Sequence, residues 1–302
     1  MKKIPHVFVG VIFGIGFCSL AAVANIDSPQ DVADLQNIHR LKDAGHYPEA
    51  QQQIKQLIAR VKGNPKGEET YVAALHEQAG CHLKMEQYDE ALKCYEQEEP
   101  LMAKLMGTEN RGYATMLDNW AQACLGAKQV AKAEQLQNRS IEIYLKLKPV
   151  PETDLAQDYG NLAQTYLREG KLDKALETEQ KSYDMMKTLL PANSPQLAVI
   201  VDNMGFILRT EKRLPEAEEY HRRALKLLEP LGVHPDAASA MDNVACCLAE
   251  EHKFKDSIPL LDRELAMWKQ LYGPNSKQAQ ECSQRRATIE AQAKAWTAAG
   301  NK

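Results

Sequence analysis

The chain has 302 residues, with 37 Lys and Arg, 41 Asp and Glu, and a formal net charge of -4. The basic residues are interspersed with acids, which excludes the clustered positive surface that a nucleic-acid-binding protein needs. Ala, Leu, Glu, Lys and Gln dominate and aromatic residues make up only 6% of the chain, so the composition predicts a helical protein.

Residues 1–24 have the layout of a secretory signal peptide: a basic start, an apolar stretch at 7–17 and a small-x-small triplet at 22–24. We predict cleavage before Asn25, which exports the rest of the chain to the periplasm or the extracellular space. The alternative is an uncleaved membrane anchor, because residues 4–24 are long enough to cross a bilayer. Membrane contact is then expected through this segment alone.

Removal of Lys2 and Lys3 with the leader reduces the 37 basic residues to 35, against 41 acidic ones. Six cysteines remain in the mature chain, and an even number in an exported protein permits disulfides. They lie in helix-forming stretches, where cysteine is commonly a small core residue, so we expect mostly buried free thiols. The six are Cys81, Cys94, Cys124, Cys246, Cys247 and Cys282.

Six short stretches of similar sequence recur after the leader. Each ends at a small residue, and these small residues are separated by 41, 42, 42, 42 and 40 positions. The stretches are GHYPEA (45–50), EQYDEA (86–91), KQVAKA (128–133), GKLDKA (170–175), KRLPEA (212–217) and HKFKDS (252–257). A period this regular predicts a repeat architecture.

Units two to six carry a second small residue twelve positions before the first: Ala79, Ala121, Ala163, Gly205 and Ala245. Two small residues on either side of a short polar turn let two antiparallel helices pack closely. Pro48 and Pro215 fall where the second helix should begin, a position that tolerates proline. Each unit is therefore predicted to be a helical hairpin, and one further helix after the sixth unit is expected to cover it.

The segments YGNLAQTYLREGKLDKALETEQKSY and VDNMGFILRTEKRLPEAEEYHRRAL, with the connector LEPLGVHPDAASA, resemble the tetratricopeptide repeat family in its 42-residue, kinesin-light-chain-like form. The resemblance implies an all-α, right-handed α-solenoid of about six hairpins at 25–276, with residues 277–302 as a C-terminal capping helix and tail. It also implies that the first helices line a concave surface, where such proteins typically bind peptides or other proteins. Ile38, Glu98 and Glu264 depart from the family pattern, because a small residue is usual at these positions.

An asparagine stands two positions before the small residue in the first helix of four consecutive units: Asn119, Asn161, Asn203 and Asn243. On a helix it lies about 200° from that small residue, so it is predicted to point away from its own partner helix, toward the concave side. An amide can donate and accept hydrogen bonds, which suits the backbone of an extended peptide. The alternative is that it bonds the neighbouring repeat and sets the geometry between repeats.

The next step of the same helix face carries Gln122, Gln164, Phe206 and Cys246, and Arg168 and Arg209 stand beyond them. We predict that Gln122, Gln164, Arg168, Phe206 and Arg209 bind a partner together with the four asparagines. An acidic segment or a C-terminal carboxylate would suit the two arginines. The adjacent Asp118, Asp202 and Asp242 are expected to be solvated or polar residues of the helix, and in the groove they would repel such a ligand.

No phosphate loop, zinc-protease motif or nucleophile turn occurs in the sequence, so we predict that the protein is not an enzyme. The densest group of potential metal ligands surrounds His76 and His82, which point about 240° apart on a helix, so neither a metal nor another cofactor is expected. The predicted function is an exported scaffold that binds an unidentified peptide or protein on its concave surface. The alternative is an assembly subunit of an envelope complex that uses its edges and terminal helix.

Overall fold

A computed structural model of the chain describes residue 26 and residues 28–300. The leader predicted at 1–24 lies outside the described residues. Every regular element within them is a helix, and they contain no strand. None of these helices is both long enough and apolar enough to cross a membrane. The predicted all-α architecture is confirmed.

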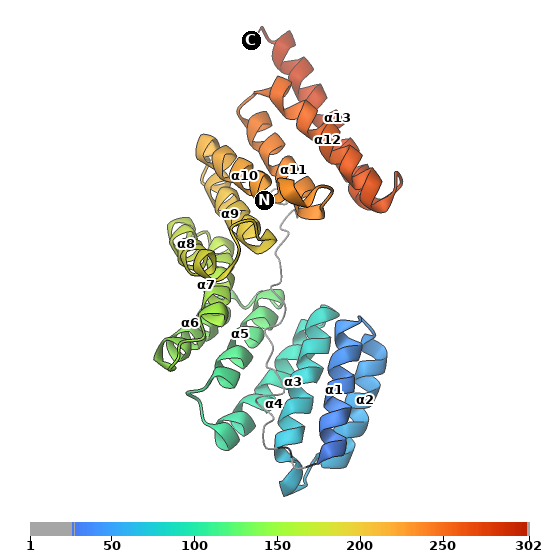
Figure 1. The fold of residues 1–302 in the computed structure, drawn as a ribbon, viewed down its shortest axis with the longest axis vertical. Helices are drawn as coiled ribbons and strands as arrows, with labels where there is room; N and C mark the ends of the chain where they lie inside the picture. Colours follow the sequence, from blue (N-terminus) through green and yellow to red (C-terminus); the bar gives the residue numbers. More distant parts are fainter. Residues whose placement is uncertain (1–25, 27, 301–302) are drawn as a thin grey trace. The chain divides into compact units, whose positions relative to one another are not determined.

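Contacts among the helices divide the chain into two compact units, with a boundary between Glu169 and Gly170. Within each unit the helices follow one another in hairpin packing (Figure 1). The first unit contains α1 (Pro29–Asp43), α2 (Tyr47–Val61), the short η2 (Pro65–Gly67), α3 (Glu68–Lys84), α4 (Tyr88–Met106), α5 (Arg111–Gly126), α6 (Val130–Lys146) and α7 (Glu152–Arg168). The second contains α8 (Leu172–Leu189), α9 (Pro195–Thr210), α10 (Leu214–Leu228), η3 (Glu229–Leu231), α11 (Pro235–Glu250), α12 (Phe254–Tyr272) and α13 (Lys277–Ala298).

The turn inside each hairpin contains one residue with a positive φ, in the left-handed region. It is the first residue of the recurring stretch. Its φ ranges from +57° at Glu86 to +78° at Gly45. In the last hairpin the N–H of His252 donates to Ala249 and that of Lys253 donates to Leu248, which satisfies carbonyls at the end of α11. Glycine favours this conformation, yet four of the six positions carry Glu, Lys or His. The packing of the two helices therefore imposes the turn.

The small residues predicted to bring the two helices together are buried. Those at the ends of the recurring stretches are all 0% exposed: Ala50, Ala91, Ala133, Ala175, Ala217 and Ser257. In the last hairpin, Ser257 Oγ donates to the carbonyl of Ala245 at 2.8 Å, which joins the two predicted small positions directly. The prediction of close-packed helical hairpins is confirmed.

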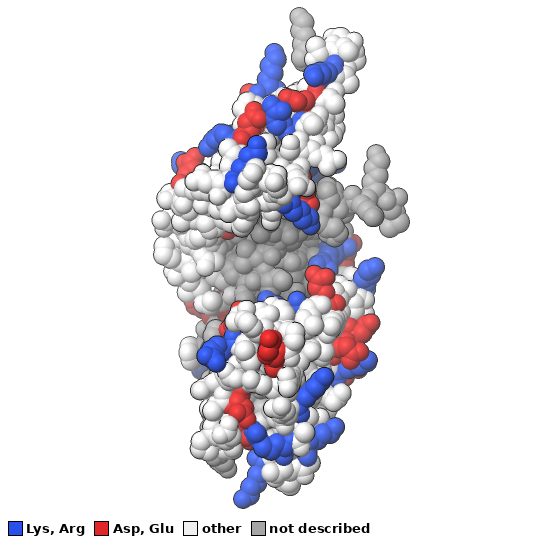
Figure 2. Space-filling view, turned by 90° about the vertical axis from the view of Figure 1, so that its right-hand side faces the viewer, with Lys and Arg blue, Asp and Glu red and all other residues white. Residues whose placement is uncertain are grey.

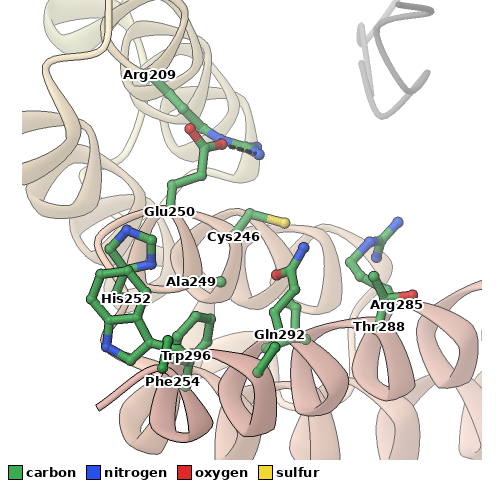
Figure 3. A pocket seen from close by; sticks show the side chains of 13 residues that line it. Arg209, Cys246, Ala249, Glu250, His252, Phe254, Arg285, Thr288, Gln292 and Trp296 are labelled. Atoms are coloured by element: carbon green, nitrogen blue, oxygen red, sulfur yellow. Dashed lines mark hydrogen bonds and ion pairs between the residues drawn. The ribbon is translucent and has the colours of Figure 1, made fainter. Parts of the chain in front are cut away.

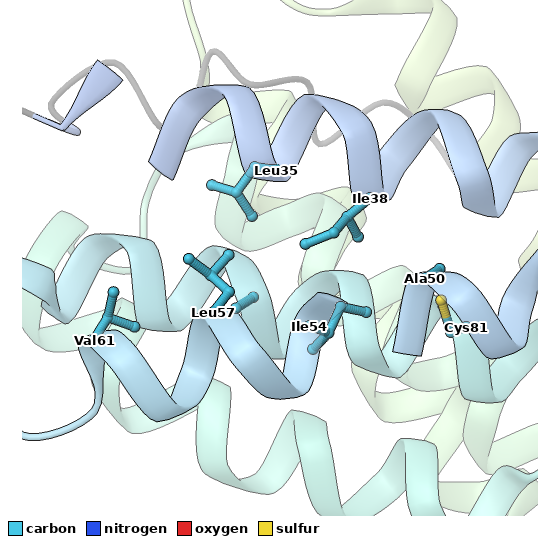
Figure 4. Packing of buried hydrophobic residues seen from close by; sticks show 8 residues of the cluster. Leu35, Ile38, Ala50, Ile54, Leu57, Val61 and Cys81 are labelled. Carbon is cyan, nitrogen blue, oxygen red and sulfur yellow. The ribbon is translucent and has the colours of Figure 1, made fainter. Parts of the chain in front are cut away.

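The first hairpin packs around an aliphatic side chain where the later ones use a small residue. Ile38 of α1 is fully buried and packs in a cluster with Leu35, Ile54 and Leu57 (Figure 4). The cluster extends to Cys81 of α3, so the first repeat is joined to the second by the same apolar core.

The C-terminal helix α13 packs on the last hairpin. Ala279 and Cys282 lie in a cluster with Trp268, and Ile289 lies in another with Phe254. The six cysteines of the described residues are free thiols, and all except the half-exposed Cys246 are buried, in agreement with the prediction. On the face drawn in Figure 2, acidic and basic side chains are interspersed.

Gly205 in α9 faces the imidazole of His221 in α10. The ring is fully buried, and its Nδ1 lies 2.6 Å from Asp202 Oδ1. A Cβ atom at position 205 would lie 2.8 Å from the ring, closer than side chains normally approach. Glycine is therefore required here because the adjacent histidine fills the space.

We expect Gly205→Ala to lower the free energy of unfolding by about 1 to 2 kcal/mol, because overpacking outweighs the gain in helix propensity. Gly80→Ala in α3 is the matched control, since its Cβ would meet only the end of the Lys42 side chain at 3.4 Å. It should raise stability by about 0.5 to 1 kcal/mol. Urea unfolding of both variants checks the signs, and stabilisation by Gly205→Ala would contradict this account.

Candidate functional site

Three of the four predicted asparagines bond to the repeat that precedes them. In the first unit, Asn161 Nδ2 donates to Asp118 Oδ2 at 2.8 Å, from α7 to α5. In the second unit, Asn243 Nδ2 donates to Asp202 Oδ2 at 2.7 Å, from α11 to α9. Both bonds join an asparagine to the residue just before the asparagine position of the preceding repeat. This is the geometry expected if the amide sets the register between repeats.

The other two asparagines follow preceding repeats that lack an aspartate at that position. The counterpart for Asn203 is Gly160, which has no side chain, and Asn203 Nδ2 donates instead to Glu179 Oε1 of α8 at 2.9 Å. The counterpart for Asn119 is His76, which pairs with Glu98 at 2.9 Å. Asn119 Nδ2 is buried and has no hydrogen-bond partner among the described residues. Contact of the four amides with a peptide stays a prediction.

The prediction that the neighbouring aspartates are solvated is wrong. Asp118 is 8% exposed and Asp242 is 3% exposed. Asp202 is half-buried and is bonded to both His221 and Asn243. Burial raises the pKa of Asp118 to about 7, although the hydrogen bond from Asn161 opposes the shift. These carboxyls lie at the interfaces between repeats, where they accept bonds from the first helix of the following repeat.

The C-terminal helix continues this pattern with an arginine. Arg285 of α13 stands 42 positions after Asn243, and its Nη1 lies 2.6 Å from Asp242 Oδ1 in α11. Burial raises the pKa of Asp242, although Arg285 and Arg209 oppose the shift. The sequence prediction assigned no contact between repeats to α13 and omitted Arg285. Its spacing from Asn243 was the signal that could have identified it.

The second predicted row lies nearer the solvent. Four of its members are half-exposed: Gln122, Gln164, Phe206 and Cys246. Arg168 is exposed, and its Nη1 donates to the carbonyl of Leu125 at 3.2 Å. Arg209 Nε donates to Glu250 Oε1 at 2.7 Å. This row is therefore accessible, and its arginines already hold partners within their own unit.

Arg209 and Cys246 line a pocket in the second unit, of about 730 Å³, together with residues of α13 (Figure 3). The other predicted site residues do not line it. Gln122, Gln164, Arg168, Asn119 and Asn161 belong to the first unit, whereas Asn203, Phe206 and Asn243 belong to the second unit outside this pocket. Of the residues that line the pocket, the sequence predicted only Arg209 as a binding residue, and it missed the side that α13 supplies.

Apolar side chains form much of the pocket. Ala249 of α11, Phe254 of α12 and Ile289 of α13 line it, and Trp296 of α13 stacks on His252 with ring centroids 3.7 Å apart and planes 13° from parallel. This stack stands at one end of the pocket in Figure 3. A pocket of this volume, with apolar side chains beside several polar ones, is suited to holding part of a ligand.

Charged groups also line the pocket. Arg209 is held by Glu250, which also accepts a hydrogen bond from Lys212 at 2.8 Å. Burial opposes ionisation of Glu250, but the bonds from Lys212 and Arg209 outweigh it and keep its pKa below the usual range. Arg285 extends from α13 beside Thr288 (Figure 3). The arginines are therefore fixed in position by carboxylates.

We expect the Glu179 carboxyl to make stability depend on pH. Burial raises its pKa from 4.5 to about 8, although the bond from Asn203 opposes the shift. The protonated form of Glu179 is favoured in the folded chain. The contribution of Glu179 to the free energy of unfolding is therefore complete below about pH 4.5 and is lost as the pH rises through about 8. Relative to the wild type, Glu179→Gln should become more stable by roughly 2 to 4 kcal/mol between about pH 5 and about pH 9.

Urea unfolding at the two pH values checks this expectation. Glu177→Gln on the same helix is the control, because Glu177 is exposed and pairs with the exposed Lys181. Its pH profile should follow the wild type. A Glu179→Gln profile that also runs parallel to the wild type would contradict the shift.

Comparison with known proteins relates the chain to proteins of the same architecture. The tetratricopeptide repeat model matches residues 70–146 and 196–270, about half of the chain. No curated protein matches the sequence.

Solved structures show the same fold at low sequence identity. The kinesin light chain TPR-like repeats from Podosopora anserina are 18% identical, with a TM-score of 0.59 and coverage of 67% of this chain and 96% of that one. BtubC (BKLC) from P. vanneervenii is 16% identical, with a TM-score of 0.63 and coverage of 76% and 93%. The quorum sensor NprR from B. thuringiensis is 14% identical, with a TM-score of 0.67 and coverage of 85% and 70%. The chain therefore belongs to the tetratricopeptide repeat family, with a kinesin-light-chain-like fold.

Proposed function

We propose that this protein is an exported interaction scaffold that binds a peptide or a partner protein on the surface of its first helices, at the pocket between α11 and α13. The family supports the general role of a scaffold. The leader sequence supports export, and the pocket supports this mode of binding. No catalytic constellation was predicted from the sequence, and the proposed role requires none.

The pocket carries the proposal because it is an open volume of about 730 Å³ on this surface. Three of the four asparagines use their amide nitrogens within the protein, which leaves them less able to hold a partner. Arg209 and Cys246 remain at the surface beside the apolar side chains of α13. A partner segment can therefore bury apolar area there without displacing a bond between repeats.

A second candidate is the assembly subunit that docks through its terminal helix. One observation favours it: Ala287 of α13 stands 42 positions after Ala245, which is 0% exposed against its partner helix. Ala287 is exposed. It lies about 140° around α13 from the residues that line the pocket, so a partner on that face would leave the pocket empty.

Two tryptophan substitutions on α13 separate these candidates. Gln292→Trp should fill the pocket, because Gln292 extends into it from an exposed position (Figure 3). Partner capture by crosslinking from the protein's own cell envelope should fall at least about tenfold. Ala287→Trp adds the same side chain outside the pocket and should leave capture unchanged, and both thermal transitions should match the wild type. Loss of capture in Ala287→Trp alone would favour the assembly subunit.

Export has a separate test. Mass spectrometry of the protein purified from its own cells should find a mature N-terminus near Asn25, because the triplet at 22–24 places the cleavage site there. The control is Ala24→Leu, which should block cleavage. An intact Met1 on protein recovered from a soluble cytoplasmic fraction would contradict export, and an intact Met1 in the membrane fraction would indicate an anchor.

A further inference from the structure

We infer that the pocket between α11 and α13 selects a partner segment by a bulky uncharged side chain, aromatic or aliphatic, and not by a carboxylate. The inference rests on the proposed function and names the chemistry of the partner. It replaces the acidic ligand that two arginines suggest from the sequence.

The arginines at the pocket already have carboxylate partners. Glu250 lies 2.7 Å from Arg209 and 2.8 Å from Lys212, and it lines the pocket itself. Arg285 lies 2.6 Å from Asp242 and 3.8 Å from Glu264. A carboxylate that entered the pocket would meet arginines already paired with carboxylates, and it would be repelled by Glu250.

The aromatic side of the pocket suits an apolar side chain. The stacked rings of His252 and Trp296 form a flat wall, and Phe254 lies 5.8 Å from the His252 ring. Ala249 is small, so it leaves the space open between this wall and Ile289. A partner ring placed there gains offset or edge contacts with these aromatics as well as the burial of its own area.

Two polar residues on α13 complete the pocket. Gln292 extends toward Cys246 and can both donate and accept a hydrogen bond, and Thr288 carries a hydroxyl (Figure 3). A volume of about 730 Å³ exceeds that of one side chain, so it also admits the backbone on either side. Neutral amide and hydroxyl groups can hydrogen-bond the N–H and C=O groups of a peptide backbone without selecting for a charged side chain.

Capped peptides test the inference directly. The probes are Ac-Gly-Gly-Trp-Gly-Gly-NH₂ and the same peptide with Asp in place of Trp, added to the mature chain labelled with ¹⁵N in its three tryptophans. The readout is the indole signal of Trp296, assigned with Trp296→Phe. The Trp peptide should shift this signal and bind at least about tenfold more tightly than the Asp peptide. Its affinity should change little with salt, because apolar contact is not screened.

Gln292→Phe fills the pocket without adding an indole signal and should abolish the shift, whereas Ala287→Phe on the outer face of α13 should leave it unchanged. Equal or tighter binding of the Asp peptide, weakened by salt, would overturn the inference. So would the absence of a Trp296 shift with either peptide. The proposed function is judged separately, by whether Gln292→Trp abolishes capture of the natural partner.

Discussion

Polar bonds at one position of the first helix connect several repeats to the one before. Asn161 and Asn243 use this position to reach an aspartate of the preceding first helix, and Arg285 uses it in the terminal helix. A repeat in a solenoid contacts only its neighbours, so these interfaces carry much of the stability of the array. A bond of fixed length at a fixed position also determines which turns of the two helices meet.

All but one of the carboxyls that accept these bonds are buried, the exception being the half-buried Asp202. Their burial links the interfaces to pH and limits where a partner can bind. Burial raises the pKa of Asp118 to about 7 and that of Glu179 to about 8. The asparagine amides that bond to these carboxyls are used between repeats. The side chains that a partner can reach are therefore those of the next row on the same helix face. In the second unit that row includes Arg209 and Cys246, both at the pocket.

The pocket exists because the terminal helix continues past the position at which the earlier first helices end in a turn. By the repeat spacing, the turn of α11 at His252 corresponds to position 294, yet α13 continues to Ala298. Its last turns bring Trp296 onto His252 and add an aromatic wall beside Ala249. The helix that covers the last hairpin thus also supplies one side of the proposed binding site.

The sequence by itself determined the repeat period, the helical hairpins and the close packing at positions such as Ala217 and Gly205. These features depend on spacing within one repeat, which the chain displays directly. Tertiary structure alone decided which group each asparagine meets, because that depends on the side chain one repeat earlier and on the register of two helices. Asn161 meets Asp118, whereas Asn203 follows a glycine and bonds to Glu179. The pocket was equally hidden, because it arises where side chains of α9, α11, α12 and α13 meet.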